Sequence, residues 1–242
     1  MPPAVAASDP ASDLFLRLDQ LNEIGAALSL EKDLNALLEK ILVAAKTITR
    51  ADGGTLYLVE GEDTARQLRF EIVRTASLDI AMGGTTGNPI PFYPIQLYRD
   101  GEPNNSMVAA YAAIHGTTVN IADAYSEEGF DFSGTRRFDQ KTGYRSKSFL
   151  TVPMKNHEGE IIGVLQLINS QPPGTSDIVP FAEADQRLAE SLASQAAIAL
   201  TNRQLINQLE NLFESFIELI NTAIDEKSPY TGGHCQRVPV LT

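Results

Sequence analysis

The chain has 242 residues, of which 43% are apolar, enough for one domain of about 150 residues with helical extensions or for two small domains. Its formal net charge of −12, from 31 acidic and 19 basic residues, repels nucleic-acid backbones and anionic membrane surfaces, so we expect neither as a partner. Its one cysteine, Cys235, excludes an internal disulfide framework, and without a signal-like start or an apolar run near about 18 residues we expect a cytoplasmic protein.

The first 50 residues predict a lead-in followed by two helices. Residues 1–12 are rich in alanine, proline and serine, a composition typical of disordered segments. Leucines and a glycine then recur at spacings of four and three, which predicts a helix over residues 13–28. Ser29 is the expected N-cap of a second helix, which ends at the Ala-Asp-Gly-Gly run of residues 51–54.

Two strands and a long loop follow. The runs GTLYLVEG (residues 54–61) and QLRFEIVRTASL (residues 67–78) have the residue types and alternation of strands joined by a polar turn. Residues 83–105 are rich in proline, glycine and asparagine, so we expect a loop with little regular structure there.

The next segment predicts a short helix and a basic patch. Residues 106–116 have a helical composition, with Ser106 as the expected cap and Gly116 as the stop. Residues 135–148 hold five basic side chains and one acidic side chain. They predict either a solvated basic loop or a small-anion site, in which Arg137 and Arg145 would hold a phosphate.

Residues 147–170 give the clearest hairpin signal in the chain. Two β-rich runs flank an Asn-His-Glu-Gly turn, whose Asn156 and Gly159 suit a tight reversal. Pro153 lies inside the first run, and because proline cannot donate to the ladder we expect a bulge or an unpaired side there.

Residues 186–227 predict one long helix with a coiled-coil seam. Its apolar residues alternate at spacings of four and three over five heptads, and a second stripe recurs at period seven. The seam is Leu188, Leu192, Gln195, Ala199, Asn202, Ile206, Leu209, Phe213, Phe216, Ile220 and Ala223, and the second stripe is Ile198, Leu205, Leu212 and Leu219. We expect a homodimer through residues 13–28 and 186–227; the alternative is a helix lying on its own domain, which about 60 Å of helix would overshoot.

These elements predict an α+β fold, with an antiparallel sheet of about six strands between helical layers. Three stretches carry a resemblance to a known family: TVNIADAYSEEGF (residues 118–130), FDQKTGYRSKSFLTVPMKN (residues 138–156) and GEIIGVLQLIN (residues 159–169). They resemble the GAF domain, in the branch found in cyclic-nucleotide phosphodiesterases and adenylyl cyclases. The resemblance implies a ligand-sensing regulatory domain over residues 13–185.

That branch carries an Asn-Lys pair followed, after a spacer, by Phe-x-x-x-Asp-Glu. Asn169, Phe181 and Asp185 match this motif, whereas Ser170 replaces the lysine and Gln186 the glutamate. In the family the lysine and the aspartate form an internal ion pair, so the resemblance implies that this chain lacks that pair.

The resemblance also implies a set of ligand contacts. The matching positions are Val108, Ala109, Phe138, Asp139, Thr142, Ser146 and Gln166. Hydroxyls, a carboxylate and amides at a helix start suit a cyclic nucleotide, and no other cofactor is implied. Tyr125, Phe130, Phe132 and Tyr144 are candidates either for stacking on a base or for core packing. The alternative function is a scaffold with a vestigial pocket that serves dimerisation only.

The sequence AIDEKSPYTGGHCQRV, residues 223–238, resembles the opening of an HD-GYP domain, the bacterial metal-dependent class that hydrolyses cyclic di-GMP. His234 matches a histidine of that family's catalytic cleft. The other histidines are His115 and His157, which we expect on the surface, and no His-Asp pair occurs. We therefore expect residues 228–242 to be the truncated start of such a domain, with no catalysis in these 242 residues and a divalent metal only in the full-length protein.

Overall fold

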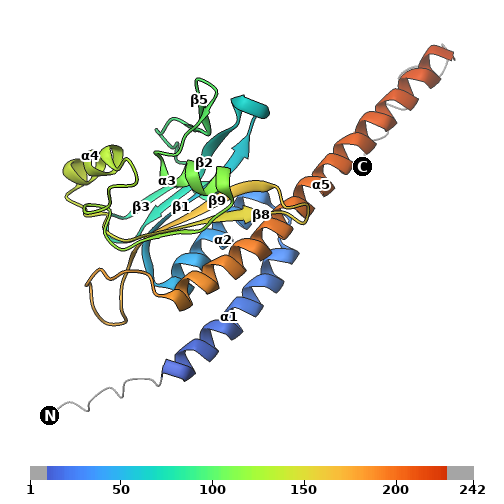
Figure 1. Ribbon diagram of the computed structural model, residues 1–242. Helices are drawn as coiled ribbons and strands as arrows, with labels where there is room; N and C mark the ends of the chain where they lie inside the picture. The colour runs from blue at the N-terminus through green and yellow to red at the C-terminus, as the bar shows by residue number, and fades with distance from the viewer. Residues whose placement is uncertain (1–9, 228–242) are drawn as a thin grey trace. The chain divides into compact units, whose positions relative to one another are not determined.

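The computed structural model describes residues 10–227, which divide between two compact units, Met1–Leu200 and Thr201–Thr242 (Figure 1). Most of the expected lead-in lies outside the described residues, but its last three residues already belong to the first helix. The expected HD-GYP start at residues 228–242, with His234 and Cys235, also lies outside them.

Helices form one layer of the first unit: α1 (Pro10–Leu30), α2 (Leu34–Thr49) and the beginning of α5 (Glu183–Lys227). The prediction that Ser29 caps α2 is wrong, because α1 continues through it and its hydroxyl donates to Gly25 O at 3.0 Å. Asp33 is the cap instead, and its Oδ1 accepts from Ala36 N at 2.7 Å. Serine and aspartate are both good caps, so the choice depends on where α1 ends.

An antiparallel sheet lies against this layer, in the strand order β3-β2-β1-β9-β8-β7, with β4 paired to β2. The strands are β1 (Ala51–Glu60), β2 (Gln67–Thr75), β3 (Ile80–Gly83), β4 (Ile95–Gln96), β7 (Val119–Ile121), β8 (Phe149–Lys155) and β9 (Ile161–Ser170). The predicted α+β class and both hairpins are confirmed, and the sheet has seven strands where about six were expected. The register shifts between Met154 and Lys155, one residue beyond Pro153.

The other face of the sheet carries α3 (Val108–His115) and α4 (Ser133–Thr142). Ser106 does not cap α3; its hydroxyl donates to Asn104 Oδ1 at 3.0 Å, whereas Gly116 ends the helix in the left-handed conformation as expected. The expected loop over residues 83–105 contains η2 (Gly84–Thr86), β4, β5 (Tyr98–Arg99) and β6 (Glu102–Pro103). A further turn, η1 (Asp63–Ala65), joins β1 to β2.

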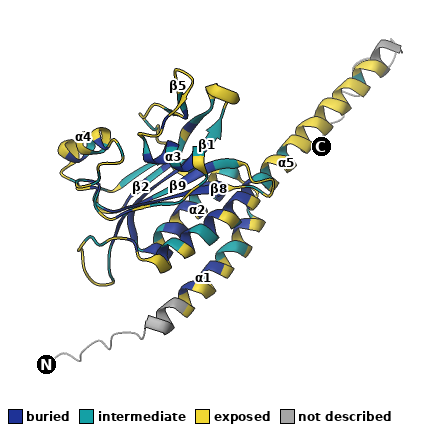
Figure 2. Ribbon diagram, viewed as in Figure 1, coloured by how far each residue is buried: buried dark blue, intermediate teal, exposed yellow. Residues whose placement is uncertain are grey.

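The main core lies between the sheet and the layer of α1, α2 and α5, and Figure 2 shows the buried faces turned toward each other. Gly54 illustrates the close packing, because a Cβ there would lie 2.8 Å from Leu42 Cδ1 on α2. Two smaller clusters occupy the opposite face, under α3 and around Phe132 and Phe149. This second face is less completely filled, and it holds the candidate site.

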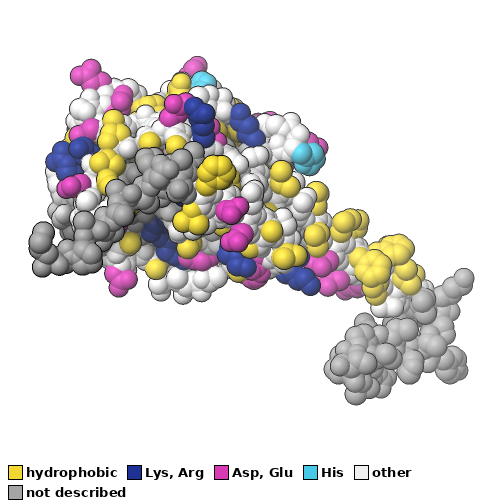
Figure 3. Space-filling model, turned by 90° about the horizontal axis from the view of Figure 1, so that it is seen from below, with side chains coloured by type: hydrophobic (Ala, Val, Ile, Leu, Met, Phe, Trp, Pro, Cys, Tyr) yellow, Lys and Arg dark blue, Asp and Glu magenta, His cyan; other side chains and the backbone are white. Residues whose placement is uncertain are grey.

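The described part of the second unit is the helical segment of α5 from Thr201 to Lys227. Its large apolar side chains are exposed (Figure 3): Leu205, Ile206, Leu209, Leu212, Phe213, Phe216, Ile217, Leu219 and Ile220. They include five of the eleven seam residues and three of the four residues of the second stripe. Of the seam residues nearer the start of α5, Leu188, Leu192 and Ala199 are buried in the core of the first unit. The homodimer itself stays a prediction.

Candidate functional site

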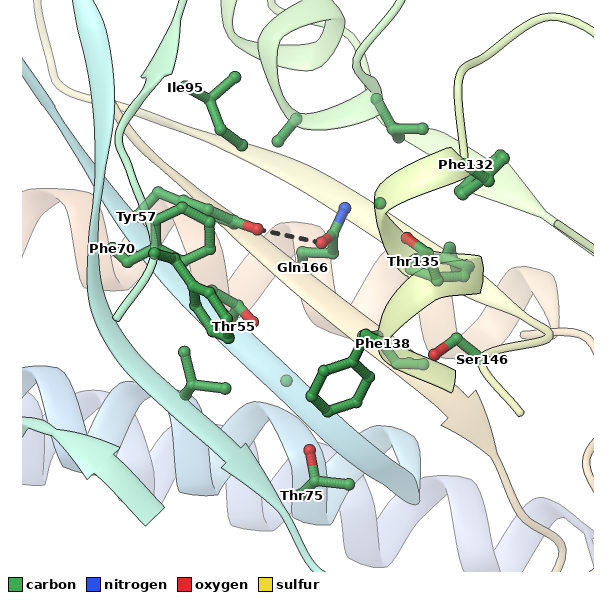
Figure 4. Close-up of a pocket in the computed structure, with 18 of the residues that line it drawn as sticks. Thr55, Tyr57, Phe70, Thr75, Ile95, Phe132, Thr135, Phe138, Ser146 and Gln166 are labelled. Atoms are coloured by element: carbon green, nitrogen blue, oxygen red, sulfur yellow. Dashed lines mark hydrogen bonds between the residues drawn. The ribbon is translucent and has the colours of Figure 1, made fainter. Parts of the chain in front are cut away.

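A cavity of about 320 Å³ lies between the sheet and the helices α3 and α4. Figure 4 shows side chains from several elements turned toward it: Thr55 and Tyr57 of β1, Phe70 and Thr75 of β2, Gln166 of β9, and Thr135 and Phe138 of α4. Rings and aliphatic groups dominate the lining, with hydroxyl and amide groups and the carboxylate of Asp131 between them. None of the described residues that line it is a lysine or arginine. This composition is typical of a small-molecule pocket.

Two helices begin at the wall of this cavity. The first backbone hydrogen bond of α3 runs from Tyr111 N to Met107 O, so the N–H groups of Val108, Ala109 and Ala110 have no partner within the helix. The first bond of α4 runs from Arg136 N to Phe132 O at 2.9 Å. Both first turns line the cavity, at Val108 and Ala109 and at Gly134 and Thr135. Each helix start carries a partial positive charge, but in α4 the carboxylate of Asp131, which also lines the cavity, already accepts from Ser133 N at 2.8 Å. The start of α3 is therefore the place where an anionic group can be accepted without a cationic side chain.

A chain of hydrogen bonds fixes the amide of Gln166 in the cavity. Tyr57 OH donates to Gln166 Oε1 at 3.2 Å, the dashed line in Figure 4, and Gln166 Nε2 donates to Thr151 Oγ1 at 3.1 Å. Burial raises the pKa of the Tyr57 hydroxyl above its usual range, so it stays a neutral donor. Gln166 keeps one donor and one acceptor position for a ligand.

Tyr144 closes the end of the cavity near the beginning of β1. Its hydroxyl donates to Asp52 Oδ2 at 2.6 Å, and the same carboxylate accepts from Ser77 N at 3.0 Å and from Ser77 Oγ at 2.6 Å. Burial, with the hydrogen bond to Asp52, raises the pKa of the Tyr144 hydroxyl. The segment that follows α4 is thereby fastened to the first hairpin.

Two positions implied by the resemblance do not line the cavity. Asp139 is buried behind α4, where Oδ1 accepts from Ser146 Oγ at 2.8 Å and Oδ2 accepts from Ser146 N at 2.8 Å and Tyr125 OH at 2.7 Å. Thr142 is exposed, and its hydroxyl donates to Phe138 O at 2.9 Å. The structure therefore gives Asp139 a positioning task and leaves Thr142 at the surface. Val108, Ala109, Phe138, Ser146 and Gln166 do line the cavity.

The basic segment is a helix, α4, followed by a short link to β8, rather than the loop that the sequence predicted. The Arg145 guanidinium stacks over the Tyr125 ring, 4.2 Å from its centroid, and Arg136 lies 5.6 Å from the same centroid. Neither arginine lines the cavity, and Arg137 also lies outside its lining. Of the four aromatic candidates, Phe132 and Tyr144 face the cavity, whereas Tyr125 and Phe130 do not.

The residues of the family motif are structural. Asn169 is fully buried with φ +59°; its Oδ1 accepts from Lys147 N at 2.8 Å, and its Nδ2 donates to Arg145 O at 2.8 Å. Phe181 is a buried core residue. Asp185 caps the start of α5 by accepting from Ala182 N at 3.0 Å.

The ion pair of the family motif is absent, as expected, but Asp185 is not left without a cation. Arg17, on α1, forms an ion pair with Asp185, and both side chains are 10% exposed. Ser170, at the position of the family's lysine, instead donates its hydroxyl to Thr49 O at 3.3 Å. The cation for Asp185 thus comes from another part of the chain.

Sequence reasoning missed the wall that β2, β3 and the following segment contribute. Ile80 and Met82 of β3 line the cavity, together with Val73 of β2. Arg74 holds this wall: it is 8% exposed, pairs with Glu39 of α2, and donates from Nη1 to Met82 O at 2.5 Å. A buried arginine inside a strand pattern was the available signal, but the sequence does not reveal its partner.

Neither a metal site nor a membrane span is found in the described chain. Among residues 10–227, no group of three or more His, Cys, Asp or Glu side chains lies close enough together to hold a metal ion. No helix in the same residues is long and apolar enough to cross a bilayer.

Comparison with known proteins agrees with the fold. The model of the GAF domain family matches residues 33–200. The dual 3′,5′-cyclic-AMP and -GMP phosphodiesterase 11A of Takifugu rubripes is 31% identical over 209 residues, which cover 85% of this chain and 21% of that protein. The cGMP-specific 3′,5′-cyclic phosphodiesterase of Drosophila melanogaster is 29% identical over 216 residues, 87% of this chain and 17% of that protein. The chain thus spans about a fifth of the length of these curated relatives.

Solved structures show the same fold. The GAF domain of a phosphoenolpyruvate-protein phosphotransferase from Coxiella burnetii superposes with a TM-score of 0.59 at 14% identity, over 81% of this chain and 98% of that one. At this identity the likeness concerns the fold alone.

Proposed function

The chain belongs to the GAF domain family, and on that premise we propose that its cavity binds a small regulatory ligand, of which a cyclic nucleotide is the class that fits best. The start of α3, whose first N–H groups have no partner within the helix, lies on a largely apolar cavity, and this observation carries the proposal. A cyclic phosphate has one negative charge, which unpartnered N–H groups can accept. A flat base can lie against aromatic rings, and the hydroxyl and amide groups of the lining can bind its edges.

The size of the cavity and the relatives support the same ligand class. About 320 Å³ falls within the range of small-molecule sites, roughly 300–1,000 Å³. The matched relatives are named for phosphodiesterases of cyclic AMP and cyclic GMP. The absence of lysine and arginine from the described lining argues against a ligand with several phosphates, because such a ligand needs cationic partners.

A thermal-shift screen of the chain with cyclic AMP, cyclic GMP and cyclic di-GMP tests the proposal. A ligand that binds only the folded state at 100 times its Kd stabilises it by about 2.7 kcal/mol. We expect one cyclic nucleotide to raise the Tm, Gln166→Leu to reduce the shift, and Thr142→Ala, at an exposed position outside the cavity, to leave it unchanged. Asp139→Ala is a poor probe, since it also releases Ser146 and Tyr125. A folded protein with no shift for any nucleotide would favour the scaffold function.

We further propose that α5 passes the state of the cavity to a C-terminal HD-GYP phosphodiesterase domain in a homodimeric bacterial protein. The exposed apolar stripes of α5 and the likeness of residues 223–238 to the opening of that domain support this proposal. One residue inserted near Asn207 rotates all that follows by about 100°. In the full-length protein the insertion should uncouple phosphodiesterase activity from the ligand, and an unchanged response would refute the proposal. Light scattering measures the dimer independently.

A further inference from the structure

The lining of the cavity is most exposed at two places. Of the residues that line it, three are exposed: Phe92, in the segment between η2 and β4, and Asp131 and Gly134, at the beginning of α4. The other lining residues are buried or half-buried. These two places are the candidate routes by which a ligand reaches the cavity.

A separate surface cleft of about 400 Å³ lies beside the first place. Phe70 and Phe92 line both the cleft and the cavity, so their rings form the wall between the two spaces. The ring centroids of this pair are 5.3 Å apart, and the ring of Tyr57 follows 4.7 Å from that of Phe70. Exposure falls along this row, from 39% at Phe92 to 4% at Tyr57.

The segment that carries Phe92 is fastened at its ends only. Asn88 O accepts from Gly83 N at 2.8 Å, and Asn88 Nδ2 donates to Ala81 O at 2.9 Å. Residues 89–94, which lead from there to β4, include three prolines without an N–H, and none of these six described residues makes a hydrogen bond. The Phe92 ring can therefore move away from Phe70 without breaking a hydrogen bond.

The beginning of α4 is held more firmly. Asp131 N donates to Ser106 O at 2.8 Å, and Asp131 Oδ1 accepts from Ser133 N at 2.8 Å. The adjacent Phe132 is buried, with its ring centroid 5.2 Å from that of Phe149. Opening the cavity here would break these hydrogen bonds and disturb a core cluster.

We infer that the surface cleft is the route by which a ligand reaches the cavity and that Phe92 is its gate. With Phe92 against Phe70 the two spaces are separate; with Phe92 displaced they join. The exposed neighbour Tyr93, which is 92% exposed and lines neither space, takes no part. The gate is a property of the cavity itself, and only the identity of what passes through it rests on the proposed function.

Access can be measured without any ligand, because the chain contains no tryptophan. Phe149→Trp places a single tryptophan, which can be excited without exciting the seven tyrosines, at a buried position on the cavity wall. In that background we expect Phe92→Ala to raise the acrylamide quenching constant at least threefold, Phe92→Leu to raise it less, and Tyr93→Ala to leave it unchanged. Equal quenching in Phe92→Ala and Tyr93→Ala would overturn the inference, as would a larger rise in Asp131→Ala than in Phe92→Ala. Far-ultraviolet circular dichroism establishes that each variant is folded, and Phe92→Leu serves if Phe92→Ala is not.

A kinetic experiment adds the ligand. With 2′-anthraniloyl cyclic GMP as the probe, Phe92→Ala should raise the association and dissociation rates together by at least threefold, whereas Tyr93→Ala should change neither. Rates that match the parent would refute the gate. If the probe does not bind the parent protein, the thermal-shift screen decides the ligand class, and the quenching experiment still decides the gate.

Discussion

The ion pair between Arg17 and Asp185 should be the most sensitive single contact in the helical layer. Both side chains are 10% exposed, and the other described bond of the Asp185 side chain is its acceptance of Ala182 N. Replacing Arg17 with methionine keeps most of the side-chain volume but leaves a buried carboxylate without its cation. Breaking such a pair costs 3–5 kcal/mol, and because Asp185 keeps an amide donor we expect about 3 kcal/mol.

A double-mutant cycle in urea measures this coupling. With an m-value of about 1–3 kcal/mol/M, Arg17→Met should lower the urea midpoint by about 1–3 M. Asp185→Asn removes the charge but can still accept from Ala182, so the double variant should lose about 2 kcal/mol less than the sum of the single losses. The exposed pair of Lys40 with Glu31 is the control, and Lys40→Met should cost less than about 1 kcal/mol. Additive losses in the cycle would show that the pair contributes no coupling.

Three further substitutions test the geometry elsewhere. Asn169→Ala should lower the free energy of unfolding by about 3 kcal/mol, because buried backbone groups lose their hydrogen-bond partner and alanine disfavours the positive φ. Asn169→Gly should lower it less, since glycine tolerates that φ, and calorimetry compares the two variants. Burial raises the pKa of Glu71 in the folded state, so the stability associated with its protonated form is lost as the pH rises through that pKa. Glu71→Gln should therefore be more stable than the parent at pH 7 and equal to it at pH 4. If the variant and the parent have equal urea midpoints at both pH values, the pKa of Glu71 is not raised. Gly163→Ala would place a Cβ 2.4 Å from Tyr57 O and should lower the free energy of unfolding by about 1–3 kcal/mol. Gly134→Ala, whose Cβ would have nothing within 4 Å, should leave it unchanged, and urea unfolding compares the two variants.

Much of the fold could be predicted because its longest elements carry clean apolar periods. The helical layer was found from leucine spacing, and both hairpins were found from alternation around polar turns. The turn at Asn156 follows its residue types closely: Asn156 O accepts from Gly159 N at 3.0 Å, and Gly159 has φ +82°. Local chemistry decides such features, so local sequence is enough to predict them.

The helix α4 was missed for a physical reason. Of the ten residues of α4 only Phe138 is strongly apolar, and the buried residue of the helix is Asp139. A helix whose inner face is polar has no apolar stripe to detect, and its stability comes from hydrogen bonds to Ser146 and Tyr125. Asp139 matches a ligand-contact position of the family, but in this chain its carboxylate binds Ser146 and Tyr125 and does not line the cavity.

Some walls of the cavity could be predicted from the sequence and others could not. Positions placed by the family resemblance at the start of α3 and in β9 do line it, because the motifs flanking them fix their place in the fold. The contribution of β3 depends on Arg74 reaching Glu39, 35 residues away in sequence, and that contact is set by tertiary packing. Phe92 lies in a segment without periodicity, so its place beside Phe70 could not be predicted from the sequence.

The position of Arg17 changes the meaning of the one clear departure from the family motif. The matched region begins at residue 33, so α1 lies before it, yet Leu21 and Leu28 of α1 are buried in the main core. Arg17 supplies the cation that Ser170 cannot, and it does so at the first turn of α5. Because a displacement of α1 would leave the charge of Asp185 buried and unpaired, α1 and the beginning of α5 are expected to move together. Although serine stands at position 170, Asp185 at the start of α5 still has a cationic partner. That partner, Arg17, lies on α1, so the ion pair depends on the position of α1.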